Sequence, residues 1–252
     1  KYTTQAHEVG RIAISYTDKK TVLNQLELTD GDSLLNAAKV LFSDDIVQDV
    51  QMAIFATNER LTFNDIQRHH GPVLKLVDIA ENYIRSNIHW RVEFTGALQR
   101  TEIPVDAIRE ALLNSFCHKD YASAQSNEVA IYKDRVEIYN PGAFPEGYEP
   151  QDFIDKAERP IRRNPKIARM LYYSKDIESF GTGLKRIAEA CDAAGVRYEF
   201  KKMKSGFVVC FYRSEEKTDK KPIKADKKPI KVDRQEVIAQ YVKEHGSISN
   251  ME

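Results

Sequence analysis

The feature that most constrains the fold is a series of four motifs between Arg109 and Ile187. In chain order they are REALLNSFCHKDY, RVEIYNPGAFPEG, RRNPKIARML and ESFGTGLKRI. The first motif is typical of a helix and the second of a strand that ends in a turn, while each of the last two opens a helix. Parts of this kind, in this order, can hold a magnesium nucleotide.

Apolar periodicity predicts an alternation of helices and strands along the chain. The predicted helices cover 34–42 behind an Asp32–Ser33 cap, 71–88, 104–118, 165–171 and 184–194. The predicted strands cover 50–56, 90–94, 128–132, 135–139, 198–203 and 207–212, and the last four form two hairpins. Gly206 supplies the turn of the second hairpin. Because helices precede and interrupt antiparallel strands, the pattern favours an α+β sandwich over a doubly wound sheet.

The helix that starts near Pro104 has two faces. Its apolar stripe consists of Val105, Ile108, Leu112 and Phe116. Glu110, Asn114 and His118 fall on the opposite side, because successive residues turn by about 100° around a helix. A carboxylate can orient or deprotonate a water, and an amide oxygen one turn later can ligate magnesium. A plain solvated polar face is the alternative.

Glycines mark two more places in the motif series. Asn140 and Gly142 follow a strand, in a turn whose glycine allows close approach of a planar ligand. Gly181, Thr182 and Gly183 open a helix, where free N–H groups and the helix dipole favour an anion. Each glycine pattern alone is also explained by turn geometry, so their order after the Glu/Asn helix carries the inference.

The segment between these glycine patterns adds two arginines. Asn164 and Pro165 are a helix cap followed by proline at the first helical position. Arg162 and Arg163 precede the cap and could meet phosphates, although the structural role of the cap explains the segment by itself.

Composition excludes several classes of protein. No run of 18 or more apolar residues or secretion signal occurs, so we expect a soluble cytoplasmic protein without membrane contact. Three cysteines at wide spacing support neither a disulfide framework nor a zinc site. The tandem repeat KKPIKAD–KKPIKVD lies in a stretch with seven Lys against two Asp between Lys217 and Lys231. We interpret 214–233 as an extended linker, with a nucleic-acid contact as the alternative.

The motifs resemble a known domain. REALLNSFCHKDY is similar to REAxxNAxxHRDY, RVEIYNPG to RxEIxNPG, RRNPKIA to RNPxIA and ESFGTGLKRI to ExxGxGIxRI. These are motifs of the divergent GHKL-type ATPase-like domain that follows a Schlafen-type AlbA domain in bacterial and archaeal transcriptional regulators and RecG-related helicases. The resemblance runs from about Leu28 to Tyr212. It implies a GHKL (Bergerat-like) α/β sandwich with a mixed, largely antiparallel sheet.

The resemblance also implies a domain order. Residues 1–100 would connect to an AlbA-type domain before Lys1, and 101–213 would be the ATPase-like domain. The linker 214–233 would lead to 234–252, which resembles the opening of a winged helix-turn-helix. A simple terminal helix is the alternative for 234–252.

Residue roles follow from the resemblance. Glu110 would be the water-activating base and Asn114 the magnesium ligand, with ATP and Mg²⁺ as cofactors. The nucleotide-binding residues would be Asn114, His118, Asn140, Gly142, Gly181, Thr182 and Gly183. The chain departs from the wider group, in which an Asp reads the adenine amino group and a second Gly follows: Asn140 and Phe144 stand at those places. Asn140 can still accept a hydrogen bond, but Phe144 could fill the pocket.

These observations lead to a functional hypothesis with one main alternative. We expect a fragment of a transcriptional regulator in which a purine nucleotide acts as a switch, with weak ATPase activity left open. DNA binding would belong to domains outside or at the end of the fragment, and a homodimer is compatible. The alternative is a non-catalytic scaffold for dimerisation or domain coupling. A helicase motor is disfavoured because no GxxxxGK[ST] loop occurs.

Overall fold

The computed structural model describes residues 2–8, 10–44, 48–92, 99–156, 158–173 and 182–213. The chain divides into two compact units, Lys1–Glu215 and Glu216–Glu252. The fold given below is that of the first unit. The linker and the terminal helix predicted for 214–252 lie outside the described residues.

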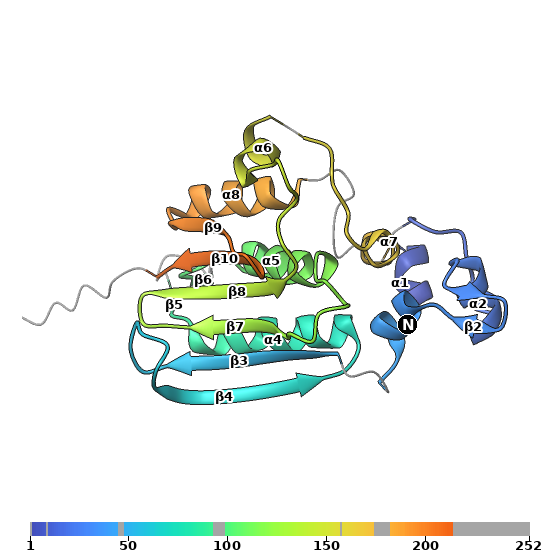
Figure 1. The fold of residues 1–252 in the computed structure, drawn as a ribbon, viewed down its shortest axis with the longest axis horizontal. Coiled ribbons are helices and arrows are strands. Elements are labelled where there is room, and N and C mark those ends of the chain that lie inside the picture. The colour runs from blue at the N-terminus through green and yellow to red at the C-terminus, as the bar shows by residue number, and fades with distance from the viewer. Residues whose placement is uncertain are drawn as a thin grey trace, which may run out of the picture. The chain divides into compact units, whose positions relative to one another are not determined.

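A six-stranded sheet forms the frame of the first unit (Figure 1). Its strands, in spatial order, are β4 (Phe63–His70), β3 (Asp49–Phe55), β7 (Asn127–Ile131), β8 (Arg135–Pro141), β10 (Gly206–Tyr212) and β9 (Tyr198–Lys202). Only the β3·β7 pair is parallel, and the other neighbours are antiparallel. The predicted α+β sandwich with a mixed, largely antiparallel sheet is therefore confirmed.

The remaining elements surround or precede this sheet. The helices are α1 (Tyr2–Glu8), α2 (Lys19–Gln25), α3 (Asn36–Phe42), α4 (Val73–Asn87), α5 (Val105–Cys117), α6 (Pro150–Asp155), α7 (Pro165–Tyr173) and α8 (Gly183–Ala194). Four short strands form two small hairpins: β1 (Thr29–Asp30) with β2 (Ser33–Leu34), and β5 (Trp90–Val92) with β6 (Gln99–Thr101). None of the helices in the described part of the chain is long and apolar enough to cross a lipid bilayer.

Helices α4 and α5 cover one face of the sheet (Figure 1). The predicted apolar face of α4 is fully buried, with Val73, Leu76, Val77, Ala80 and Ile84 at 0% exposure. Helix α5 packs against α4, α8 and β8, so it is buried on most of its circumference. Its apolar stripe is buried at Ile108, Leu112 and Phe116. The central position of α5 leaves the polar side chain of Glu110 buried against other protein elements.

Alternation along β8 decides which of its side chains meet α5. Val136, Ile138 and Asn140 are buried, while the side chains between them are partly exposed. A strand places every second side chain on one face. Asn140 therefore continues the row of the two core residues at the end of the strand.

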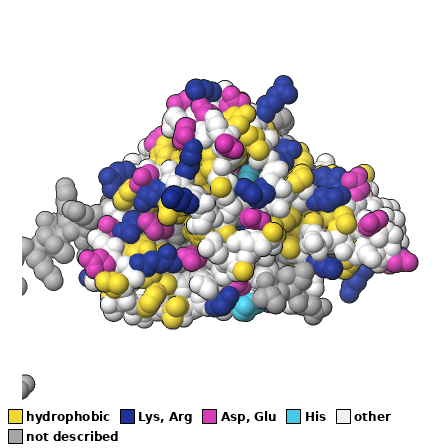
Figure 2. Space-filling view, in the orientation of Figure 1, with side chains coloured by type: hydrophobic (Ala, Val, Ile, Leu, Met, Phe, Trp, Pro, Cys, Tyr) yellow, Lys and Arg dark blue, Asp and Glu magenta, His cyan; other side chains and the backbone are white. Residues whose placement is uncertain are grey.

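The opposite face of the sheet carries charges of both signs (Figure 2). Arg135 and Lys201 each contact Glu137, at 2.8 and 3.4 Å. Arg60 pairs with Glu128 across neighbouring segments. Because each of these basic groups lies beside an acidic one, these residues do not form a basic surface.

Four sequence predictions need correction. Helix α3 begins at Asn36 with Leu35 as its N-cap, because Ser33 and Leu34 pair with β1 in a short hairpin instead of capping the helix. Helix α5 has Pro104 as its N-cap and not in its first turn.

The third correction concerns the strand end at Asn140. Asn140 and Pro141 do not leave the sheet in a turn, because they still pair with Phe207 and Gly206 of β10. Gly206 consequently belongs to a strand rather than to the hairpin turn. A Cβ at Gly206 would overlap the backbone oxygen of Asn140, so close packing of β10 on β8 explains this glycine.

Candidate nucleotide site

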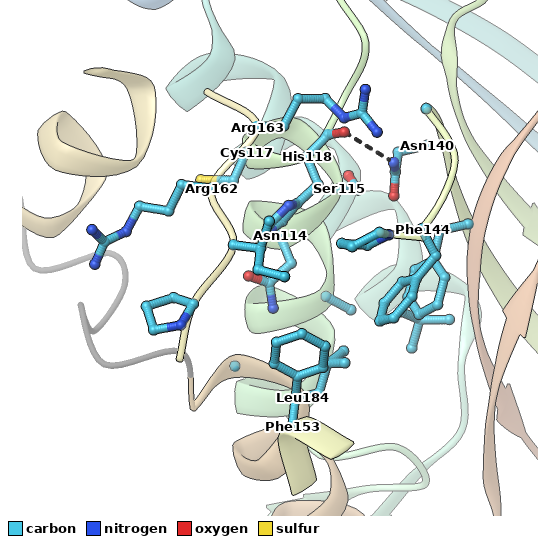
Figure 3. Close-up of a pocket in the computed structure, with 18 of the residues that line it drawn as sticks. Asn114, Ser115, Cys117, His118, Asn140, Phe144, Phe153, Arg162, Arg163 and Leu184 are labelled. Atoms are coloured by element: carbon cyan, nitrogen blue, oxygen red, sulfur yellow. Dashed lines mark hydrogen bonds between the residues drawn. The ribbon is translucent and has the colours of Figure 1, made fainter. Parts of the chain in front are cut away.

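One cavity of about 370 Å³ lies beside α5, between the end of β8 and the start of α8 (Figure 3). Its lining includes six of the eight predicted site residues, namely Glu110, Asn114, His118, Asn140, Gly142 and Gly183. Thr182 is the N-cap residue of α8 and is not among the lining residues. Gly181 lies outside the described residues. Three separate segments of the chain thus converge on one hollow of ligand size.

The polar stripe of α5 runs along the cavity. Glu110 is only 6% exposed, Asn114 is half-buried, and His118 is exposed at the C-terminal end of the helix. Asn114 Nδ2 donates a hydrogen bond to Glu110 Oε1 at 3.3 Å. The stripe is therefore not a solvated face at Glu110, since α8 covers it there.

The first turn of α8 packs directly on this pair. A Cβ at Gly183 would lie 2.6 Å from Asn114 Nδ2 and 2.8 Å from Glu110 Oε1. Gly183 is thus required by the close approach of two helices and not by an unusual backbone angle. One turn later, Arg186 Nη1 lies 3.5 Å from Glu110 Oε2. Glu110 therefore contacts Asn114 through one oxygen and an arginine of α8 through the other.

Asn140 presents a hydrogen-bond acceptor to the other end of the cavity. The residue is 3% exposed, and its Nδ2 donates to the backbone oxygens of Pro141 at 3.3 Å and His118 at 3.5 Å. Only an NH₂ group can pair with two carbonyls, so these bonds fix the orientation of the amide. Oδ1 points to the side of Phe144 (Figure 3). A ligand donor placed there would find a fixed acceptor.

Gly142 lets the chain pass close to the end of α5. Its φ is +113°, and a Cβ would lie 3.0 Å from the Asp120 nitrogen and 3.1 Å from the His118 oxygen. The sequence pattern predicts that Gly142 leaves room for a planar ligand. In the structure, the backbone at the end of α5 already requires a glycine at this position.

Aromatic and aliphatic side chains form the wall below Asn140. The apolar lining includes Ile138, Phe144, Phe153, Leu184, Phe207 and Val209. Phe144 stacks on Phe207, with ring centroids 4.9 Å apart and planes at 27°, and meets Phe153 edge-on at 5.8 Å. Phe144 is therefore held within the wall, and the cavity lies beside its ring. A flat apolar wall of this kind suits a planar ligand.

Arg162 and Arg163 lie on the rim of the cavity, and both are exposed. Arg163 donates to the Ala143 oxygen at 2.7 Å. The enclosing walls of the cavity, together with the charge of Arg163, lower the pKa of His118 to about 4. Although its ring is exposed to the cavity, His118 is therefore neutral at neutral pH and can act as donor or acceptor.

Two contributors to the site were missed or misjudged from the sequence. Arg186 follows Gly183 by three residues, and this helical spacing is a signal that could have placed both on one side of α8. Asn164 was expected only as a cap of α7. Its Nδ2 also donates to the backbone oxygens of Cys117 and Lys119, both at 2.8 Å. These bonds hold the segment that contains Arg162 and Arg163 against the end of α5.

Comparisons with known proteins agree with this fold. Residues 125–211 match the family described as "Putative ATP-dependent DNA helicase recG C-terminal". The matched segment contains Asn140, Gly142 and 181–183, whereas Glu110, Asn114 and His118 precede it. No protein with a curated description matches the chain.

A solved structure shows the same architecture. The DIP2311 protein from Corynebacterium diphtheriae superimposes with a TM-score of 0.70 at 20% sequence identity. The match covers 84% of this chain and 44% of that protein, so this chain spans less than half of its length. At this identity the likeness concerns the fold alone. The family match over 125–211 supports an ATPase-like domain in that part of the chain.

Proposed function

We propose that the cavity binds a purine nucleotide, ATP in the first instance, and that binding acts as a regulatory switch. The observation that carries this proposal is the convergence of the α5 polar stripe, the end of β8 and the first turn of α8 on one cavity. The match of 125–211 to an ATPase-like family supports the same ligand class.

One end of the cavity suits a flat base and the other end suits the negative charge of phosphates. The flat Phe144–Phe207 wall lies beside the fixed acceptor Oδ1 of Asn140, which suits a base with an exocyclic amino group. The first turn of α8 lies at the other end, where Gly183 and Glu110 line the cavity. The start of a twelve-residue helix favours negative charge.

The wider role belongs to the same proposal. We place the domain in a cytoplasmic transcriptional regulator that contacts DNA through segments outside the described residues, including 234–252. Weak hydrolysis is compatible with Glu110 as the base, but its ion pair with Arg186 favours binding over turnover.

Titration calorimetry with ATP tests the proposal directly. Wild type is expected to release heat with a saturable isotherm. Asn140→Leu removes the acceptor and should weaken binding by about tenfold or more, since an unpaired ligand donor costs on the order of 1–3 kcal/mol. Lys133→Gln is the control, because Lys133 is an exposed residue of the β7–β8 turn. No heat from wild type at millimolar ATP would overturn the proposal.

A non-catalytic scaffold is the second candidate, and one observation favours it. Glu110 and Asn114 contact each other and the first turn of α8, as expected for residues that join two helices. For this function, ATP would leave the melting temperature of the wild type unchanged, and Glu110→Gln would lower the melting temperature by the same amount with and without ATP.

A further inference from the structure

A cation lies next to the helical end of the cavity. Arg186 Nη1 lies 3.5 Å from Glu110 Oε2, and the Arg186 side chain is 47% exposed. Glu110 is the single acidic side chain among the described residues that line the cavity. Its charge is therefore balanced by a guanidinium before any ligand binds.

A magnesium ion does not fit beside its predicted ligand, Asn114. Magnesium requires a nearly octahedral shell of oxygens at about 2.1 Å and usually retains several waters. The amide of Asn114 faces the backbone of Gly183, where even one added carbon would lie 2.6 Å from Nδ2 and 3.1 Å from Oδ1. The same carbon would lie 2.8 Å from Glu110 Oε1. The first turn of α8 thus occupies the space that a hydrated ion would need.

The charges around Glu110 lead to the same conclusion. Glu110 accepts a hydrogen bond from Asn114 Nδ2 through one oxygen, and its second oxygen faces Arg186. A divalent cation beside Glu110 would also meet the positive charge of Arg186 at short range.

We infer that this site binds the phosphates of its nucleotide without magnesium, and that Arg186 is the cation that takes the place of the metal. The inference rests on the proposed nucleotide function. Arg186 adjoins the cavity through Glu110, which lines it. A guanidinium stays charged at all physiological pH values and offers a planar set of donors that matches phosphate oxygens. Arg162 and Arg163 on the rim add positive charge.

Calorimetry in two buffers tests the metal dependence. ATP is titrated into the full chain once with millimolar Mg²⁺ and once with excess EDTA. Equal Kd values are expected, and loss of binding in EDTA would overturn the inference while leaving the nucleotide function intact. Absence of binding in both buffers would instead overturn the proposed function.

A second readout tests the metal site without relying on ATP affinity. Mn²⁺ broadens NMR signals of nearby protons, so it is added to ¹⁵N-labelled protein with and without ATP. The side-chain amide signals of Asn114 are expected to keep their line width. Selective broadening of these signals would place a metal at Asn114 and contradict the inference.

Variants of two neighbouring residues separate the role of Arg186 from a general charge effect. Arg186→Gln should weaken ATP binding in EDTA by about tenfold, as expected for a lost charge-assisted hydrogen bond, and Mg²⁺ should not restore it. Lys185→Gln is the matched control, because Lys185 lies next to Arg186 with nearly equal exposure, 46%. Binding of adenosine, which has no phosphate, should be unchanged in both variants.

The outcomes of the variant series are distinct. Two results together support the inference. Arg186→Gln weakens the binding of ATP but not of adenosine, and Arg186→Lys partly restores the binding of ATP. Equal effects of Arg186→Gln and Lys185→Gln, or equal losses for ATP and adenosine, would overturn it.

Discussion

Glycines at the site act mainly through the space that they leave for neighbouring atoms. Gly183 faces the flexible ends of Asn114 and Glu110, whereas Gly206 faces the backbone oxygen of Asn140 and the ring of Tyr139. Side-chain ends can rotate away from an added methyl group, but a paired strand cannot shift without losing hydrogen bonds. The two glycines should therefore respond differently to the same substitution.

Gly206→Ala is expected to lower the free energy of unfolding by about 1–3 kcal/mol through overpacking. Gly183→Ala should cost less stability, because Ala favours helix and the contacted side chains can move, but it should displace Asn114 and Glu110 and weaken ATP binding. Urea denaturation of both variants measures which substitution lowers the free energy of unfolding more. A larger stability loss in Gly183→Ala would show that the α5–α8 contact is more rigid than described.

His118 predicts a pH dependence of stability. Its folded pKa of about 4 lies below its ordinary value of 6.5, because the cavity walls and Arg163 oppose its protonation. The neutral ring therefore contributes stability that is complete above pH 6.5 and is lost as the pH falls towards 4. Melting temperatures over this range should fall more steeply for wild type than for His118→Gln. Parallel profiles would exclude His118 as the titrating group.

At the scale of elements, the fold depends on contacts between the ends of elements that lie far apart in the sequence. Arg213, at the end of β10, pairs through Nε with Glu102 Oε1 at 2.7 Å and donates to the Tyr132 oxygen at 3.0 Å. The side chains of Glu102 and Arg213 are 2% and 11% exposed. This buried pair joins the central sheet to the segment that leads into α5.

Glu102→Ala should lower the free energy of unfolding by about 3–5 kcal/mol, because removal of one partner leaves a buried charge uncompensated. Asp32→Ala is the control: the Lys20–Asp32 pair has the same kind of contact at 2.6 Å, but its side chains are 76% and 89% exposed. Chemical denaturation should show no measurable change in the control. Similar losses in both variants would contradict the assigned role of burial.

Sequence patterns predicted the elements well where periodicity is long. The burial of α4 and the two faces of α5 follow from spacing, because one stripe must pack on the sheet. The β1–β2 hairpin was missed, since two-residue strands have no periodicity to detect. The strand end at Asn140 was placed too early because Pro141 is usually a breaker, yet it is tolerated where its missing donor is not needed.

At the scale of the whole molecule, the features that the sequence could not predict are contacts between segments far apart in the chain. Motif order grouped Glu110, Asn114, Asn140 and Gly183 in one predicted site, and in the structure all four line one cavity. The pairing of Arg186 with Glu110 depends on how closely α8 approaches α5, which no local pattern specifies. In the proposed nucleotide site, that approach puts Arg186 beside Glu110, where a metal-centred site would hold its cation.

We propose that one nucleotide contacts both ends of the cavity. An ATP titration followed by the backbone amide signals of ¹⁵N-labelled protein tests this binding mode. Saturable shifts at Asn140 and at Gly183, with the same midpoint, are expected. Saturation without shifts at these two positions, or no shifts at millimolar ATP, would overturn the proposed binding mode.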